Sequence, residues 1–176
     1  MSILKLANRF EVLLKKANGK PFGIEAKLTE ESREKLISWF EKTVGELHPQ
    51  IVCNHMTIVN VPILRREDKK ANLNPEDYPV GEKVKLKVIA YAADDKCQAV
   101  AVDPIGIVAK NKIPHITVAL NGAPAKYSNE LLANTYNPCI GPDLDAEIVI
   151  SYSWQSVPKP YIVTNVYWTG LWITNS

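Results

Sequence analysis

The chain has 176 residues, of which 46% are hydrophobic and 23% are charged, and its formal net charge is +2. This length and composition are typical of one folded domain with its own core. A net charge this small gives no argument for nucleic-acid binding by bulk electrostatics, so local groups must hold any anionic ligand. No apolar run reaches the roughly 20 residues of a membrane span.

The termini and cysteines bear on location. Residues Met1–Lys5 lack the basic start and long apolar stretch of a signal peptide. Cys53, Cys97 and Cys139 are odd in number and widely spaced, and no Cys-x-x-Cys or clustered Cys/His spacing suggests zinc. We therefore expect reduced thiols, a cytoplasmic location and no membrane or metal partner.

Helical and strand patterns precede the first polar motif. Apolar residues at helical spacing predict a helix over Ile3–Lys16, whose role the sequence leaves open. Alternation over Phe22–Leu28 predicts a strand. Thr29 is a typical N-cap and predicts a helix over Glu30–Glu46.

The next segment carries two of the three histidines. A β-branched, apolar run over Gln50–Val61 predicts a strand that Pro62 ends, and this strand contains His55 and Thr57. His48 precedes it without a partnering threonine, and we expect a structural or surface role for that side chain.

Residues 65–81 are charged and rich in turn residues, which predicts the least ordered part of the chain. The pairs Arg65-Arg66 and Lys69-Lys70 could reach phosphates from such a loop. A solvated loop face is the more common role of such a cluster, and we expect it here. Tyr78 is a candidate for stacking on a base.

Two further strand patterns lead to the second motif. Alternation over Lys83–Tyr91 and Gln98–Val102, around a short turn, predicts an antiparallel hairpin. A second motif strand is predicted over Ile113–Leu120, and it contains His115 and Thr117.

The last third predicts a short helix and up to three strands. The helix is expected over Asn129–Ala133, capped by Ser128 or by its own first residue. The strands are expected over Ala146–Trp154, Tyr161–Tyr167 and Gly170–Thr174. Strands outnumber helices and the order is mixed, which favours an α+β fold with mainly antiparallel sheet.

The two motif strands share one pattern, His-apolar-Thr: His55-Met56-Thr57 and His115-Ile116-Thr117. Successive side chains of a strand point to opposite faces, so each histidine shares a face with its threonine. A polar pair with an apolar layer behind it is typical of a site held by a core. The simpler interpretation is two ordinary strands, each with a hydrogen-bonded histidine. That interpretation would be sufficient for a single such strand, but it is a weaker explanation for the same pattern occurring twice.

Two imidazoles facing one cleft suit phosphodiester cleavage. One ring can act as general base on the attacking water and the other as general acid for the leaving oxygen, because histidine titrates near neutral pH. The threonine hydroxyls can donate to the non-bridging phosphate oxygens. This chemistry requires no metal or other cofactor, and the sequence has no acidic cluster, glycine-rich phosphate loop or nucleophile elbow.

These residues resemble the two-histidine (HxT motif) phosphoesterase superfamily, in particular the cyclic phosphodiesterase domain of fungal-type tRNA ligases. Both HxT motifs are present. Between them, Asp95–Val102 resembles the hairpin return strand of that family, and Pro124–Asn129 resembles the Pro-containing, Ser-Asn segment after its second motif. The likeness covers roughly Pro21 to Tyr152.

The resemblance implies one two-lobed domain over residues 1–176. Its α+β, bilobal fold would hold two mainly antiparallel sheets around a central cleft, with flanking helices. The implied activity is hydrolysis of RNA 2′,3′-cyclic phosphate ends to 2′-phosphates, as in tRNA processing and RNA repair. The implied partners are RNA ends or small cyclic or oligomeric nucleotides, and the oligomeric state stays open.

The resemblance also implies residue roles. The catalytic set is His55, Thr57, His115 and Thr117. His55 is assigned as the acid and His115 as the base, although the near-symmetry of the two motifs leaves this choice open. The segment after the second motif supplies candidates for substrate binding: Lys126, Tyr127 and Ser128.

Two departures leave alternatives. The chain has no kinase or ligase portion, so it is not a whole tRNA ligase, and the helix predicted over Ile3–Lys16 has no clear family counterpart. Relatives in the superfamily also cut 2′-5′ oligoadenylates or cyclic oligonucleotide signals, including phage enzymes that disarm bacterial defence. A non-enzymatic RNA-binding module is a third interpretation, but such a module would not require both histidines.

Overall fold

The computed structural model describes residues 20–153. The elements are β1 (Lys20–Leu28), α2 (Glu30–Thr43), β2 (Gln50–Ile51), β3 (His55–Asn60), α3 (Val61–Glu67), the 3₁₀-helix η1 (Pro75–Asp77), β4 (Lys83–Ala93), β5 (Cys97–Ile105), β6 (His115–Leu120), α4 (Tyr127–Asn134), β7 (Asn137–Pro138) and β8 (Asp143–Ser153).

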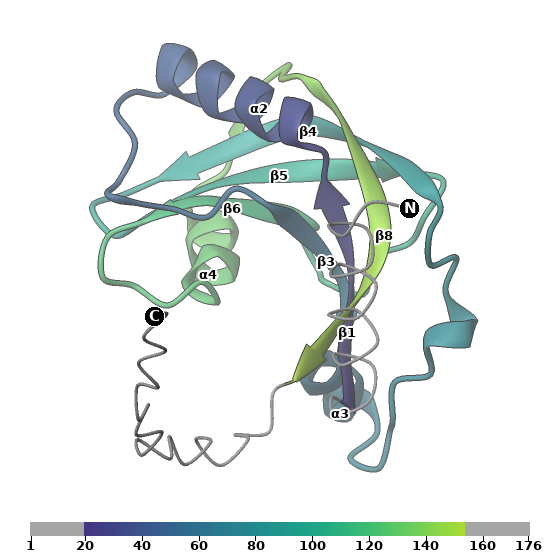
Figure 1. Ribbon diagram of the computed structural model, residues 1–176. Coiled ribbons are helices and arrows are strands. Elements are labelled where there is room, and N and C mark those ends of the chain that lie inside the picture. Colours follow the sequence, from purple (N-terminus) through teal and green to yellow (C-terminus); the bar gives the residue numbers. More distant parts are fainter. Residues whose placement is uncertain (1–19, 154–176) are drawn as a thin grey trace, which may run out of the picture.

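Six of the strands close into an antiparallel barrel (Figure 1). The order of hydrogen-bonded neighbours is β6-β3-β1-β8-β4-β5, and β5 pairs back onto β6. The short strands β2 and β7 lie off this closed path and pair with β6 and β4. Closure satisfies the backbone groups that open sheet edges would expose.

The predicted α+β, bilobal fold with two sheets is wrong. Residues 20–153 are mostly β structure, in one continuous sheet with three α-helices. The strands of the two motifs pair with each other, with Met56 opposite Ile116, and β5 also pairs with β6. These pairings join into one barrel the segments that were predicted to form two separate lobes. Periodicity predicts which segments are strands, but not which edges meet.

The barrel core contains the apolar side of both motif strands. Met56, Ile58, Ile116 and Val118 are all 0% exposed, as the alternation predicted. Helix α2 begins at Thr29, whose hydroxyl accepts the Ser32 N–H at 3.2 Å, so the predicted N-cap is confirmed. Its buried side chains, Leu36 and Phe40, join the same core.

A second apolar cluster attaches α4 to the outer face of the barrel. Leu131 and Leu132 pack there against small side chains that include Ala99 and Ala101. These two alanines lie opposite Thr117 and His115 in the β5–β6 ladder. Directly opposed residues project to the same face. Helix α4 therefore covers the face of β6 that carries the second motif.

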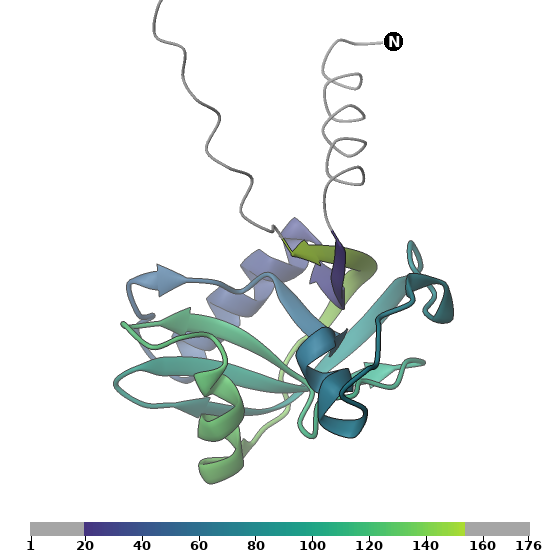
Figure 2. The same ribbon diagram turned by 90° about the horizontal axis from the view of Figure 1, so that it is seen from below.

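Helices α3 and α4 both lie on the side of the barrel away from α2 (Figures 1 and 2). The single strand predicted over Gln50–Val61 is two strands, because Cys53 takes a left-handed backbone (φ 37°) between β2 and β3. Pro62 does not simply end that strand. It occupies the first turn of α3, where its missing N–H costs nothing, so part of the region expected to be least ordered is helical.

Some of the other predicted elements are confirmed with shifted ends, and the rest fall outside residues 20–153. The predicted hairpin is β4 and β5, and the predicted strand over Ala146–Trp154 is β8. The helix predicted over Ile3–Lys16 and the strands over Tyr161–Tyr167 and Gly170–Thr174 fall outside the described residues. Within residues 20–153, every helix is too short or too polar to cross a membrane.

Candidate functional site

All four motif side chains line one cavity of about 360 Å³ on the outer face of the barrel. His55 and Thr57 come from β3, and His115 and Thr117 come from β6. Because Met56 lies opposite Ile116 in an antiparallel pair, His55 lies toward Thr117 and Thr57 toward His115. The two motifs thus form one polar surface, related by a local two-fold arrangement.

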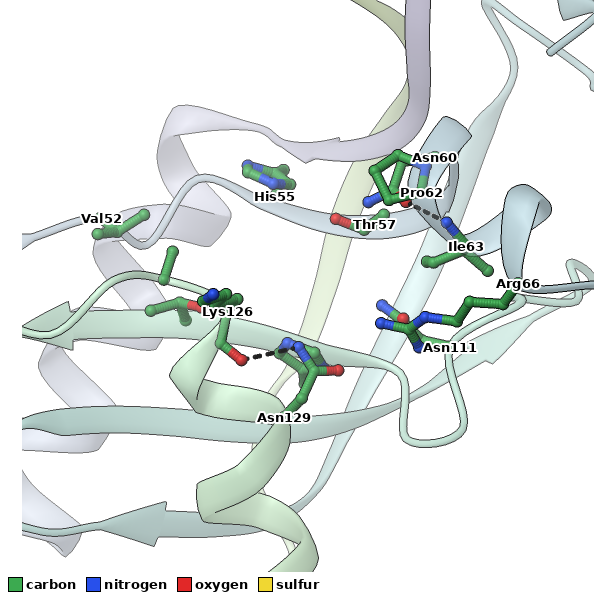
Figure 3. A pocket seen from close by; sticks show the side chains of 13 residues that line it. Val52, His55, Thr57, Asn60, Pro62, Ile63, Arg66, Asn111, Lys126 and Asn129 are labelled. Carbon is green, nitrogen blue, oxygen red and sulfur yellow. Dashed lines mark hydrogen bonds between the residues drawn. The ribbon is translucent and has the colours of Figure 1, made fainter. Parts of the chain in front are cut away.

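One wall of the cavity is built by α3. Asn60, the last residue of β3, accepts the Ile63 N–H on its side chain at 2.9 Å, and this cap starts the helix directly after the motif strand. Ile63 and Arg66 then face the cavity, and Asn111 lies next to Arg66 (Figure 3). The short strand-to-helix connection therefore fixes a guanidinium beside the histidine-threonine face.

The opposite wall is the start of α4 and the two residues before it, with Ala125, Lys126 and Asn129 in the lining. Figure 3 shows Lys126 and Arg66 on different sides of the cavity, with Thr57 between them. Among the described residues, none with a carboxylate side chain lines this cavity. Two cations and no anion in the lining favour a negatively charged ligand.

His115 lies in a buried, hydrogen-bonded setting and is 8% exposed. Its Nδ1 donates to the Ile113 carbonyl at 2.8 Å, and its Nε2 lies 3.0 Å from Oγ of Ser128. Burial lowers the pKa of His115 below its ordinary value, the bond to Ile113 opposes this shift, and the charge of His55 adds to it. The neutral ring is thus favoured near neutral pH.

His55 is more open, with a side chain that is 33% exposed. Its Nδ1 donates to the side-chain oxygen of Asn54 at 2.6 Å, and its Nε2 lies 3.8 Å from a carboxylate oxygen of Glu25. Both ring nitrogens therefore face oxygen acceptors. The two histidines have different environments despite their matching sequence motifs.

The four residues suggested for substrate binding are not all at the cavity. Lys126 lines it. Tyr127 instead donates to Asp94 at 2.8 Å, a bond that raises the pKa of the tyrosine to about 12. Ser128 is 0% exposed and lies behind His115 rather than in the lining, and Tyr78 packs partly against the barrel core.

The sequence interpretation missed several lining residues. Arg66 was placed in a solvated loop cluster, although it lines the cavity from a helix. The signal for that helix was Asn60-Val61-Pro62, an N-cap followed by proline in the first turn. Asn111 comes from a connection with no such signal. His48 lies outside the lining, and its Nε2 donates to the Asp94 carbonyl at 2.8 Å.

Within residues 20–153, no three His, Cys, Asp or Glu side chains are grouped so that they could hold a metal ion. No protein-family model matches the chain, and no curated protein is significantly similar to it in sequence.

Proposed function

We propose that this protein is a metal-independent phosphodiesterase of the two-histidine type, which hydrolyses RNA 2′,3′-cyclic phosphate ends to 2′-phosphates. The observation that carries the proposal is that His55, Thr57, His115 and Thr117 line one cavity. An in-line displacement at phosphorus needs a base and an acid on opposite sides of the reacting atom. Two histidines from neighbouring strands that line the same cavity can supply this base and this acid.

The environments of the histidines support one assignment of roles. Buried His115 favours its neutral form and is suited to the base. His55 faces acceptors from Asn54 and Glu25 and is suited to the acid, which would protonate the leaving 3′ oxygen. Thr57 and Thr117 lie on the same face, where their hydroxyls can donate to phosphate oxygens as negative charge develops.

The cavity walls support a small anionic substrate. The cavity volume of about 360 Å³ is near the lower end of the range for ligand sites. One nucleotide at a chain end therefore suits the cavity better than a long bound segment. Arg66 and Lys126 are available for phosphate groups on either side of the reacting one. We propose that these two side chains mainly hold the substrate.

We also propose a cytoplasmic location for this activity. All three cysteines, which lie among the described residues, are free thiols, and Cys53 and Cys97 are buried. Burial raises the pKa of Cys53 to about 12 and that of Cys97 to about 11, so neither thiol is reactive. Free, unreactive thiols suit a reducing compartment.

The experiment is a substrate panel assayed in EDTA. It contains nucleoside 2′,3′-cyclic phosphates, an RNA with a cyclic phosphate end, 2′-5′ oligoadenylate and cyclic dinucleotides, and phosphorus NMR locates the phosphate in each product. We expect turnover of the cyclic phosphate ends to 2′-phosphates. Cleavage of only the oligoadenylate or the cyclic dinucleotides would replace this substrate with a signalling nucleotide. Binding of RNA without turnover of any substrate would contradict an enzyme.

A further inference from the structure

Ser128 occupies a buried position between both residues of the second motif. Its Oγ lies 3.0 Å from Nε2 of His115, 3.0 Å from Oγ1 of Thr117 and 2.7 Å from the Ala125 carbonyl. The side chain is 0% exposed, since α4 packs it against the outer face of the barrel. A nucleophilic role for Ser128 is excluded by this burial, because its oxygen does not line the cavity.

Counting hydrogens shows which acceptors the Ser128 hydroxyl can serve in the resting protein. Nδ1 of His115 uses its hydrogen on the Ile113 carbonyl, so in the neutral ring Nε2 is a bare acceptor. A buried acceptor without a partner costs about 1–3 kcal/mol. Two acceptors therefore compete for the one hydroxyl hydrogen of Ser128: the Ala125 carbonyl at 2.7 Å and Nε2 at 3.0 Å. Thr117 in turn donates to Ser128.

Protonation of His115 ends this competition. Nε2 then carries a hydrogen and donates to Oγ of Ser128. The Ser128 hydroxyl no longer serves Nε2 and donates to the Ala125 carbonyl at 2.7 Å.

We propose that Thr117 and Ser128 relay a proton from the attacking water to Nε2 of His115. The single lone pair of Nε2 points at the buried Ser128, so water in the cavity cannot reach it along that direction. Thr117 lines the cavity and contacts Ser128, which makes a continuous path of two hydroxyl groups. This inference rests on the proposed phosphodiesterase function. Ser128 acts through His115 and Thr117 and is therefore a positioning residue.

The step balances without a further reactant. Water gives one hydrogen to Thr117, Thr117 gives its own to Ser128, and Ser128 gives its own to Nε2. The remaining hydroxide oxygen bonds to phosphorus, the bond from phosphorus to the 3′ oxygen breaks, and that oxygen takes a proton from His55.

The charged groups around His115 set the pH at which the relay starts. His55 on β3, Lys126 at the N-cap of α4 and Arg66 on α3 line the same cavity, and Glu25 on β1 faces His55. Replacing Ser128 by alanine changes none of these charges. A comparison of wild type with Ser128→Ala therefore isolates the hydroxyl path from the electrostatics of the cavity.

The test measures kcat, KM and the solvent isotope effect in H₂O/D₂O mixtures for wild type and Ser128→Ala. Ser32→Ala is the matched control, because Ser32 is also a buried serine, and its Oγ accepts the Asp145 N–H at 2.8 Å far from the cavity. We expect Ser128→Ala to lower kcat roughly 100-fold, within the range for a lost proton-transfer path. KM should stay within about twofold, and Ser32→Ala should keep the wild-type kcat.

The isotope data separate a relay from a packing role. Several hydrogens moving together should give wild type a curved dependence of rate on deuterium fraction, and Ser128→Ala a linear one. A wild-type kcat with a curved dependence in Ser128→Ala would contradict the relay while leaving the phosphodiesterase intact. Absence of turnover by wild type on the whole panel would contradict both.

Nitrogen NMR of wild type keeps the test independent of the folding of any variant. We expect the neutral His115 ring to carry its hydrogen on Nδ1, with Nε2 as acceptor. A hydrogen on Nε2 in the neutral ring would overturn the relay, because Ser128 could not then deliver a proton to that atom.

Discussion

Met56 lies directly opposite Ile116 where β3 pairs with β6, and both side chains are 0% exposed in the barrel core. Each is the middle residue of a His-x-Thr motif, so the four polar neighbours are directed to the other face of the sheet. One apolar pair in the core thereby fixes both motifs in a common cavity. The site depends on this pairing more than on any loop.

The two threonines should contribute less to catalysis than the histidines. We expect Thr57→Val to lower kcat by at most about 10²–10³-fold, the usual cost of one lost donor to a developing oxyanion. Thr117→Val should lower it at least as much, because Thr117 also belongs to the proposed relay. Steady-state kinetics with Thr43→Val, at the exposed end of α2, as control check this. Wild-type kcat in both motif variants would exclude any role for the hydroxyls.

Arg66 should hold substrate rather than take part in proton transfer. Replacing it by alanine removes a cation from the cavity wall, and we expect KM to rise roughly tenfold with a smaller change in kcat. Arg65→Ala is the matched control. Arg65 precedes Arg66 on α3 and is also exposed, but it lines a separate cavity. Equal effects of the two variants would show that only the general charge of α3 matters.

Burial of His115 should make the protein less stable in mild acid. The pKa of His115 is lowered in the folded state, so the unfolded chain binds more protons between that value and the ordinary 6.5. The free energy of unfolding is therefore unaffected by the titration of His115 above pH 6.5. It falls as the pH drops below 6.5, by at most about 1.4 kcal/mol per pH unit. Urea unfolding at several pH values measures the effect, and His115→Gln should lose that part of the slope. Parallel pH profiles for wild type and variant would contradict it.

Local patterns in the sequence predicted the pieces of this site but not their assembly. Alternation identified the buried faces of both motif strands, and Thr29 identified the start of α2, because each depends on neighbours within one turn or strand. Barrel closure depends on the pairing of Val100 with Ile116 and of Met56 with Ile116, which are contacts between distant segments. No local pattern encodes them, so two lobes were predicted where one barrel exists.

The same limit applies to the cavity walls. Ser128 was considered a cap or a substrate ligand, but it lies inside the first turn of α4, whose N-cap is Lys126. Its burial follows from the packing of Leu131 and Leu132 on the alanines of β5, a tertiary contact. The Arg66 side chain was expected to face solvent, because clusters of charged residues usually do. Its place in the wall follows from a helix that begins directly at the end of β3.

The most direct test of the central proposal is the kcat of His55→Ala and His115→Ala, measured in EDTA on the phosphodiester that wild type cleaves fastest. Each variant loses one of the two proton-transfer groups that line the cavity. We predict that each lowers kcat by at least about 100-fold while the protein remains folded by circular dichroism. Wild-type turnover in both variants would contradict catalysis by the paired histidines.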